Sequence, residues 1–268
     1  MSRRPLSPRP DAKPPLRTAS KAAEAEAELA ELARLIHQHS PEALQRVAAH
    51  PRLNEDLALA LLGRRDLDER VLNDLARNHS VMKSRKVLNA LVRHARTPRH
   101  VTVPLVRRLF TFELMELALT PALAADLKMV AEEALRLRLE AISAGERLTL
   151  ARRASARVAA ALLLDTEARV VEAALDNPFL TEAFLVKAVL DPDAPAHFIH
   201  GVCRHRKWSL RREIKCALLR SQHTPLAQAI AIAHSLRAAE VREALEQSLL
   251  AENIRVYLLQ LKASQGGR

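Results

Sequence analysis

Two related stretches, RKVLNALVRHARTP at residues 85–98 and REIKCALLRSQHTP at residues 212–225, decide the fold. Both are rich in Leu, Ala, Arg and Lys, the residues that lose least on entering an α-helix. Each ends in Thr-Pro, which places a capping hydroxyl before a proline whose missing N–H costs nothing at the first helical position. We therefore expect a helix in each stretch and the start of another helix at each Thr-Pro.

The resemblance between the two stretches extends over a longer region. Residues 48–98 align without a gap on residues 175–225, at an offset of 127, and 11 of the 51 positions are identical. Many of the differing positions exchange one apolar residue for another. We interpret this as an internal duplication, and we expect Ala90 and Leu91 to be buried like Ala217 and Leu218. The alternative is that two helical segments of similar composition coincide.

Prolines punctuate the chain at regular intervals. Ser40-Pro41, Thr97-Pro98, Thr120-Pro121 and Thr224-Pro225 are each predicted to begin a helix. Pro51 and Pro98 are 47 residues apart, and so are Pro178 and Pro225. This interval is the length of a two-helix repeat of the HEAT or armadillo type, so it predicts an α-solenoid of antiparallel helix pairs.

The composition supports an all-α protein. Of 268 residues, 49% are hydrophobic, but there are only five glycines, five phenylalanines, one tryptophan and one tyrosine. Such a chain can form a core, yet it lacks the turns and aromatic strands of β-folds. The longest apolar run, Val158–Leu164, has seven residues, which is far too short to span a membrane. With two cysteines and no apolar leader, the sequence predicts a cytoplasmic protein without membrane contact.

The chain divides into four predicted regions. Residues 1–19 hold five prolines and five basic residues, which predicts a disordered basic tail. Residues 20–40 are predicted to form an amphipathic capping helix, whose apolar face consists of Leu29, Leu32, Leu35 and Ile36. Residues 41–262 are the solenoid, and residues 263–268 are a flexible end.

The repeat units resemble HEAT-like α-solenoids, in particular the leucine-rich-repeat-variant type. The resemblance is carried by His50-Pro51-x-Leu53 and by Asn177-Pro178-x-Leu180, and it covers residues 41–250. It implies a helical-repeat architecture and says far less about function. Members of that type can carry an N-terminal cysteine cluster for an iron–sulfur centre, and the N-terminal half of this chain has no cysteine.

No motif for catalysis is found. The sequence contains no G-x-S-x-G, G-x-x-x-x-G-K-[ST] or G-x-G-x-x-G motif. Possible metal ligands gather at His197, His200, Cys203, His205, Cys216 and His223, but no pair has the spacing of a metal motif. We expect no enzymatic activity, no metal, no cofactor and no small-molecule substrate. A base-excising enzyme on a HEAT-like fold is disfavoured because aromatic residues are scarce.

Positive charge is concentrated in two blocks. The net charge is +11, and residues 61–110 and 201–230 carry +8 and +6. The blocks lie at residues 83–108 and 204–220, within or next to the duplicated segments, so a solenoid could display them as one basic stripe. The candidate residues of this stripe are Lys83, Arg85, Lys86, Arg96, Arg99, Arg206, Lys207, Trp208, Arg211, Arg212 and Lys215. Alternatively, Arg85, Arg93, Arg212 and Arg220 pair with acids such as Asp66 and Asp193 along the stack or keep helix faces solvated, and we favour this interpretation for these four residues. The better binding candidates are then Lys83, Arg206, Lys207 and Arg211.

Trp208 could stack on a base or anchor a protein contact, but a core position is the simpler expectation, because its counterpart is Val81.

Two classes of function remain open. The solenoid architecture predicts a non-enzymatic scaffold that binds a protein partner. The alternative is a protein that binds nucleic acid, or another polyanion such as an acidic protein surface, through the two basic blocks.

Overall fold

The computed structural model describes the backbone of residues 16–266 and shows only helices in this range. Seventeen α-helices and one 3-10 helix follow one another through short turns. The chain is therefore all-α, as predicted. No helix of the described residues is both long and apolar enough to cross a membrane. The predicted tail lies outside these residues as far as residue 15, and α1 already begins at Leu16.

The described residues form two compact units, which divide between Leu105 and Val106. Unit 1 precedes this point and unit 2 follows it. The helices of the first unit are α1 (Leu16–Ile36), α2 (Pro41–Ala49), α3 (Glu55–Leu62), α4 (Glu69–Arg77), α5 (Arg85–Arg93) and α6 (Arg99–Val106), whose last residue belongs to the second unit. Those of the second unit are α7 (Thr111–Leu119), α8 (Ala125–Arg136), α9 (Ala144–Arg153), α10 (Ala156–Ala161), η1 (Leu162–Leu164), α11 (Ala168–Leu175), α12 (Glu182–Val189), α13 (Ala196–Arg204), α14 (Arg212–Arg220), α15 (Leu226–Ser235), α16 (Ala238–Glu246) and α17 (Glu252–Gly266). The final helix thus extends past residue 263, where the flexible end was predicted to begin.

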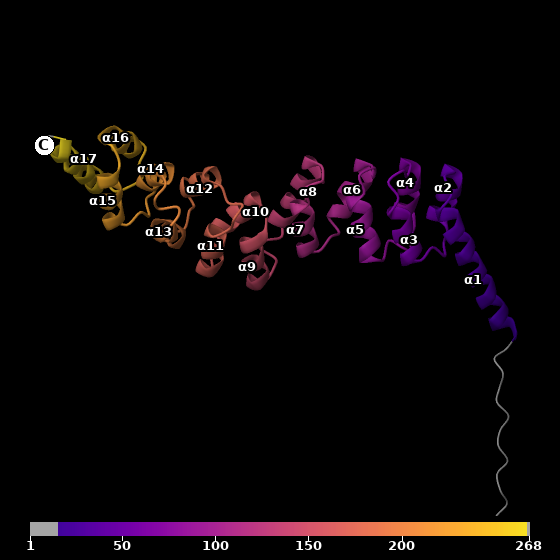
Figure 1. Cartoon of the computed structure of the whole chain (residues 1–268). Helices are drawn as coiled ribbons and strands as arrows, with labels where there is room; N and C mark the ends of the chain where they lie inside the picture. Colours follow the sequence, from indigo (N-terminus) through magenta and orange to yellow (C-terminus); the bar gives the residue numbers. More distant parts are fainter. Residues whose placement is uncertain (1–15, 267–268) are drawn as a thin grey trace, which may run out of the picture. The chain divides into compact units, whose positions relative to one another are not determined.

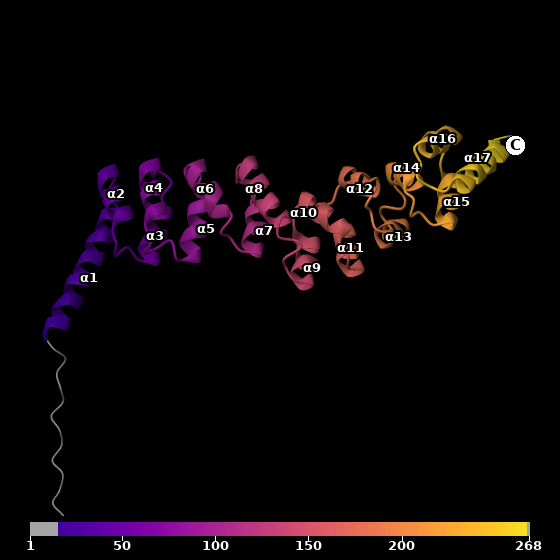
Figure 2. The ribbon, with the colours of Figure 1, turned by 180° about the vertical axis from the view of Figure 1, so that it is seen from behind.

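Most helices in both units pack against the second helix along the chain. In unit 1, α2 contacts α4 and α3 contacts α5, and these pairs lie side by side in both views (Figures 1 and 2). In unit 2, α10 contacts α12, α11 contacts α13, and α12 and α16 both contact α14. Each helix of eight or nine residues is too short to be stable alone, so its apolar face must be covered by these neighbours.

The 47-residue interval does not correspond to one helix pair. Three helices, α3, α4 and α5, lie between Pro51 and Pro98, and three others, α12, α13 and α14, lie between Pro178 and Pro225. Helices that contact each other two positions apart, such as α2 and α4 or α12 and α14, begin much closer together in the sequence than this interval. The prediction of a 47-residue unit is wrong because these helices are shorter than those of HEAT or armadillo pairs.

The offset of 127 relates helices as well as sequence. Adding 127 to the bounds of α3, α4 and α5 gives the bounds of α12, α13 and α14 to the residue. Leu91 and Leu218 are both fully buried, as predicted. Ala217 is also buried, whereas Ala90 is only half-buried.

The same hydrogen bonds recur at this offset even where the residue type changes. At the ends of six helices, a polar side chain accepts from the backbone N–H two residues later, over 2.8 to 3.4 Å. The corresponding pairs are His50 and Asn177, Asn78 and His205, and His94 and Ser221. Imidazole, amide and hydroxyl groups all supply an acceptor. The helix ends are therefore equivalent although their residues are not identical.

Two of the threonines before prolines close the preceding helix, although the next helix does begin within one residue of the predicted start. Ser40 does cap α2 as predicted, because its Oγ accepts from Ala43 N at 3.4 Å. Thr97 and Thr224 instead donate to the carbonyls of Leu91 and Leu218, at 2.7 and 2.6 Å. The helices that follow, α6 and α15, begin directly after the prolines, at residues 99 and 226. The hydroxyls are used by the preceding helix because its last carbonyls lack partners within the helix.

Thr120-Pro121 does not begin a helix directly either. Thr120 ends α7, and its hydroxyl donates to the carbonyl of Glu116 at 2.8 Å. The next helix starts only at Ala125. The prediction for this site is wrong for the same reason, since the hydroxyl is again used by the preceding helix.

Candidate binding surface

The first basic block lies mainly on α5 and its flanks. Lys83 and Arg96 are exposed, and neither makes an ion pair with another described residue. Lys86 Nζ lies 2.8 Å from Glu55 Oε1, and this contact raises the pKa of Lys86 and lowers that of Glu55. Arg85 is half-buried on the same helix. Only some of the predicted cations of this block are therefore available to a partner.

The acids of the alternative interpretation have other contacts. Arg64 donates to Asp66 at 2.6 Å and holds the pKa of this carboxyl down at about 2. The backbone N–H of Asp193 donates to Asp191, and the Asp193 carboxylate makes no ion pair within the described part of the chain. Asp66 and Asp193 therefore do not pair with the repeated arginines, but Arg212 of α14 does pair with an acid of α16, since its Nε lies 3.3 Å from Glu240.

The second basic block lies around the loop of residues 205–211, which joins α13 to α14. Arg206, Lys207 and Arg211 are exposed there. Arg212 lies 3.5 Å from Glu213 and 3.3 Å from Glu240, and Lys215 is half-buried. The block thus divides into an exposed loop and a helix whose charges are partly neutralised. The two blocks belong largely to different units, so one continuous stripe stays a prediction.

Trp208 is a core residue that anchors this loop. Its side chain is 2% exposed, and its Nε1 donates to the carbonyl of Leu175 at 2.8 Å. The Nζ of Lys207 lies 3.9 Å from the centre of the indole ring, a cation–π contact. The core position was the simpler expectation for Trp208. Its ring cannot stack on a base, so Trp208 is removed from the binding candidates.

A second contact joins the loop 205–211 to the loop 176–181, which follows α11. His205 Nε2 lies 3.2 Å from Asp176 Oδ1, while His205 Nδ1 accepts from the backbone N–H of Lys207 at 3.2 Å. A ring that accepts at Nδ1 has its donor at Nε2, so both ring nitrogens are used. Together with Trp208, this histidine fixes the loop 205–211 against the loop 176–181.

These paired loops expose two large apolar side chains. Phe179 is 50% exposed and Leu210 is 73% exposed. We define the paired-loop surface as Phe179, Arg206, Lys207, Leu210 and Arg211. The counterparts of these residues in unit 1, at the offset of 127, are Arg52, His79, Ser80, Lys83 and Ser84. Because unit 1 folds without apolar residues at these positions, packing of the repeat does not require Phe179 and Leu210.

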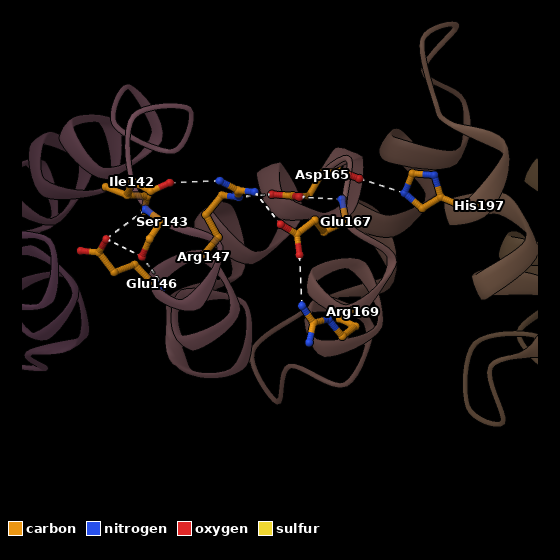
Figure 3. A network of polar contacts seen from close by, with 8 residues as sticks. All are labelled: Ile142, Ser143, Glu146, Arg147, Asp165, Glu167, Arg169 and His197. Atoms are coloured by element: carbon orange, nitrogen blue, oxygen red, sulfur yellow. Dashed lines mark hydrogen bonds and ion pairs between the residues drawn. The ribbon is translucent and has the colours of Figure 1, made fainter.

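A buried charged cluster lies elsewhere in unit 2 (Figure 3). Arg147 Nε lies 2.7 Å from Asp165 Oδ2, and these side chains are only 16% and 7% exposed. Arg147 also donates to the carbonyl of Ile142, and Asp165 accepts from the backbone N–H of Glu167. His197 Nε2 reaches the carbonyl of Asp165 at 2.9 Å. The cluster joins α9, the turn before α11 and α13. Its charged groups pair mainly with one another, so we interpret it as a structural arrangement.

The residues considered for a metal do not converge. His197 and His205 contact Asp165 and Asp176, and the thiol of Cys203 is buried, which raises its pKa to about 11. Burial also raises the pKa of Cys216. Within the described residues, no three side chains of His, Cys, Asp or Glu are placed to hold a metal ion.

Sequence reasoning missed Phe179 and Leu210. The signal that could have revealed them is their contrast with the charged residues at the matching positions of residues 48–98.

In the comparisons with known proteins, no family model matches the chain, and neither a curated protein nor a solved structure matches it.

Proposed function

We propose that this chain is a non-enzymatic helical-repeat scaffold that binds a protein partner through the paired-loop surface. The carrying observation is the exposure of Phe179 and Leu210 on two loops that Trp208 and His205 hold together. Protein contacts draw most of their affinity from a few bulky side chains surrounded by polar groups. Such side chains on loops that are already ordered lose little conformational freedom on binding.

We further propose that each unit is part of an α-solenoid built from antiparallel helix pairs and that the two copies arose by duplication. The contacts between helices two positions apart support the first proposal, because stacked repeats touch mainly their neighbours. The coincident bounds of three helices support the second. A relationship to leucine-rich-repeat-variant proteins and a cytoplasmic location are further predictions.

The charge around the surface indicates the kind of partner. Arg206, Lys207 and Arg211 are exposed and make no ion pair among the described residues; the Nζ of Lys207 lies over the Trp208 ring, and its backbone N–H donates to His205 Nδ1. Asp176, the nearby acid, is engaged by His205. Positive residues on the loop that exposes Leu210 favour an acidic segment that carries a bulky apolar side chain, because complementary charge steers encounter.

The test is affinity purification from native lysate after nuclease treatment, followed by binding of the identified partner as a pure protein. The variant is Phe179→Ser with Leu210→Ser, and the matched control is Leu226→Ser, which removes another apolar side chain of unit 2 that is 47% exposed. We expect the double variant to weaken binding at least tenfold and the control to bind normally. Equal binding by the wild type and the double variant would refute the assignment of this surface.

Nucleic-acid binding is the second candidate, and the exposed cations Lys83, Arg206 and Lys207 favour it. Changing all three to Glu should weaken binding to duplex DNA equally for all sequences. Each phosphate contact that is lost should reduce the slope of log K against log salt by about 0.9. Absence of salt-sensitive binding by the wild-type chain at low salt would exclude this candidate and leave the protein partner.

A further inference from the structure

A second feature of unit 2 is a hollow formed by three loops. Its volume is about 250 Å³, and it lies among the loops that join α12 to α13, α14 to α15 and α16 to α17. These are different connections from those of the paired-loop surface, as the labels in Figure 1 show. Leu190 and Leu249 form apolar walls, and Arg220, at the end of α14, lines the hollow.

Arg220 has no partner for its charge in the part of the chain that the structure describes. Its side chain is half-buried, and its Nε is fully buried without a hydrogen-bond acceptor. No carboxylate lies within ion-pair distance of its guanidinium. The buried Nε of Arg147 likewise has no hydrogen-bond acceptor, but Arg147 differs from Arg220 because a carboxylate, that of Asp165, lies 2.7 Å away. A cation that is partly shielded from water and has no opposing charge is less stable than a paired one, so a carboxylate bound in the hollow would stabilise Arg220.

The end of α14 does not supply this group. Arginines in a last helical turn can donate to the free carbonyls there. In α14, however, Leu218 O accepts from Thr224, Leu219 O accepts from Ser248, and Arg220 O accepts from the backbone of Leu249, over 2.6 to 2.9 Å. Since other donors occupy these carbonyls, the guanidinium is left for a ligand in the hollow.

The lining determines which anion fits. Arg220 is the one arginine or lysine in the lining, and Asp191 is the one carboxylate, so the hollow favours a single negative charge over a doubly charged phosphate. Ser221 Oγ accepts from His223 N, which leaves its hydroxyl proton available to donate to a ligand. The apolar walls suit a hydrocarbon group beside the charge.

We propose that this hollow binds a carboxylate that carries an apolar group, with Arg220 as the residue that recognises the carboxylate. The guanidinium pairs with both carboxylate oxygens, as its planar fork allows. The hydrocarbon part lies against Leu190 and Leu249. The carboxylate belongs either to a small organic acid or to the C-terminus of a peptide. This inference does not depend on the proposed scaffold function.

The test uses hexanoate as the probe and hexanamide as its uncharged match, with binding measured by calorimetry and by the shift of the thermal unfolding midpoint. The variant is Arg220→Gln, and the control is Arg153→Gln, which removes an exposed arginine from α9. We expect hexanoate to bind saturably to the wild type and the control. The Arg220 variant should bind at least tenfold more weakly, and hexanamide should not bind.

Two further measurements complete the test. The first distinguishes a peptide C-terminus from a small organic acid, and the second shows whether changing Arg220 disturbs folding. A short peptide ending in leucine should bind at least tenfold more tightly than hexanoate if the natural ligand is a peptide C-terminus, and its C-terminal amide should not bind. Arg220→Met should raise the unfolding midpoint of the free protein, because it removes an uncompensated charge.

Three results would overturn the proposal. They are no saturable binding of hexanoate up to about 10 mM, equal binding of hexanoate and hexanamide, and equal binding by the wild type and the Arg220 variant. A lower unfolding midpoint for Arg220→Met would show that Arg220 has a stabilising partner and would remove the premise.

Discussion

Replacing Asn177 by alanine tests the hydrogen bonds that join helices two positions apart along the chain. The Asn177 side chain is 1% exposed, and its amide donates to Ala151 O at 2.8 Å and to Ala154 O at 3.1 Å. Its Oδ1 accepts from the backbone N–H of Phe179 at 2.8 Å. The substitution leaves three backbone groups without this partner. At about 1 kcal/mol for each hydrogen bond, we expect the free energy of unfolding to fall by about 3 kcal/mol.

Urea unfolding measures this change in two ways. Trp208 is the only tryptophan of the chain and is buried in unit 2, so its fluorescence reports the unfolding of the unit that contains Asn177. Far-ultraviolet circular dichroism follows the helices of both units. We expect the fluorescence transition of Asn177→Ala to move to lower urea.

The matched control is Asn253→Ala, which changes an exposed residue of α17 in the same unit. Surface substitutions of this kind usually change stability by less than about 0.5 kcal/mol. If Asn177→Ala is no more destabilising than the control, the hydrogen bonds between helices two positions apart do not stabilise the repeat, and the explanation of the recurring helix ends is wrong.

Three further predictions concern the core, an ion pair and a thiol. Leu91→Ala and Leu218→Ala should each lower the free energy of unfolding by about 2 to 5 kcal/mol, because both side chains are fully buried and leave a cavity; a change within the error of a urea melt would contradict this. Asp66 has a depressed pKa of about 2, so its contribution to stability is present above about pH 4 and is lost as the pH falls toward about 2. The urea midpoint of Asp66→Asn should therefore fall less over this pH range than that of the wild type. Equal falls in the two proteins would contradict the pairing of Asp66 with Arg64. Cys203 has a pKa of about 11, so only about one molecule in a thousand should carry the thiolate at pH 8. The thiol should therefore react with a thiol reagent far more slowly in the folded protein than in urea. Similar rates would mean that the thiol is accessible in the folded protein.

The sequence by itself determined the helical nature of the chain, the offset of 127 between the two related segments and several core positions. These properties are local, since helix preference and apolar spacing depend on residues within a few turns. The buried Leu91, Leu218 and Trp208 and the Ser40 cap follow the predictions for that reason.

Only the tertiary structure decided which groups meet across helices. The repeat contains short helices that pack two positions apart, so bonding partners are separated by about thirty residues of sequence, as for Asn78 and Ala48. Spacing of prolines could not show that three helices fit between Pro51 and Pro98, or that Thr97 completes the helix before it.

The candidate sites depended on the tertiary structure even more strongly. A basic residue in the sequence can be paired, buried or exposed, and packing alone leaves Arg206 exposed, pairs Arg212 with Glu240 and isolates Arg220. Likewise, the sequence alone suggests that Phe179 is a core residue. Its exposure follows only from the packing of the loop 176–181 against the loop 205–211. Charge and hydrophobicity are properties of the sequence, whereas their availability to a partner is set by the helices packed around them.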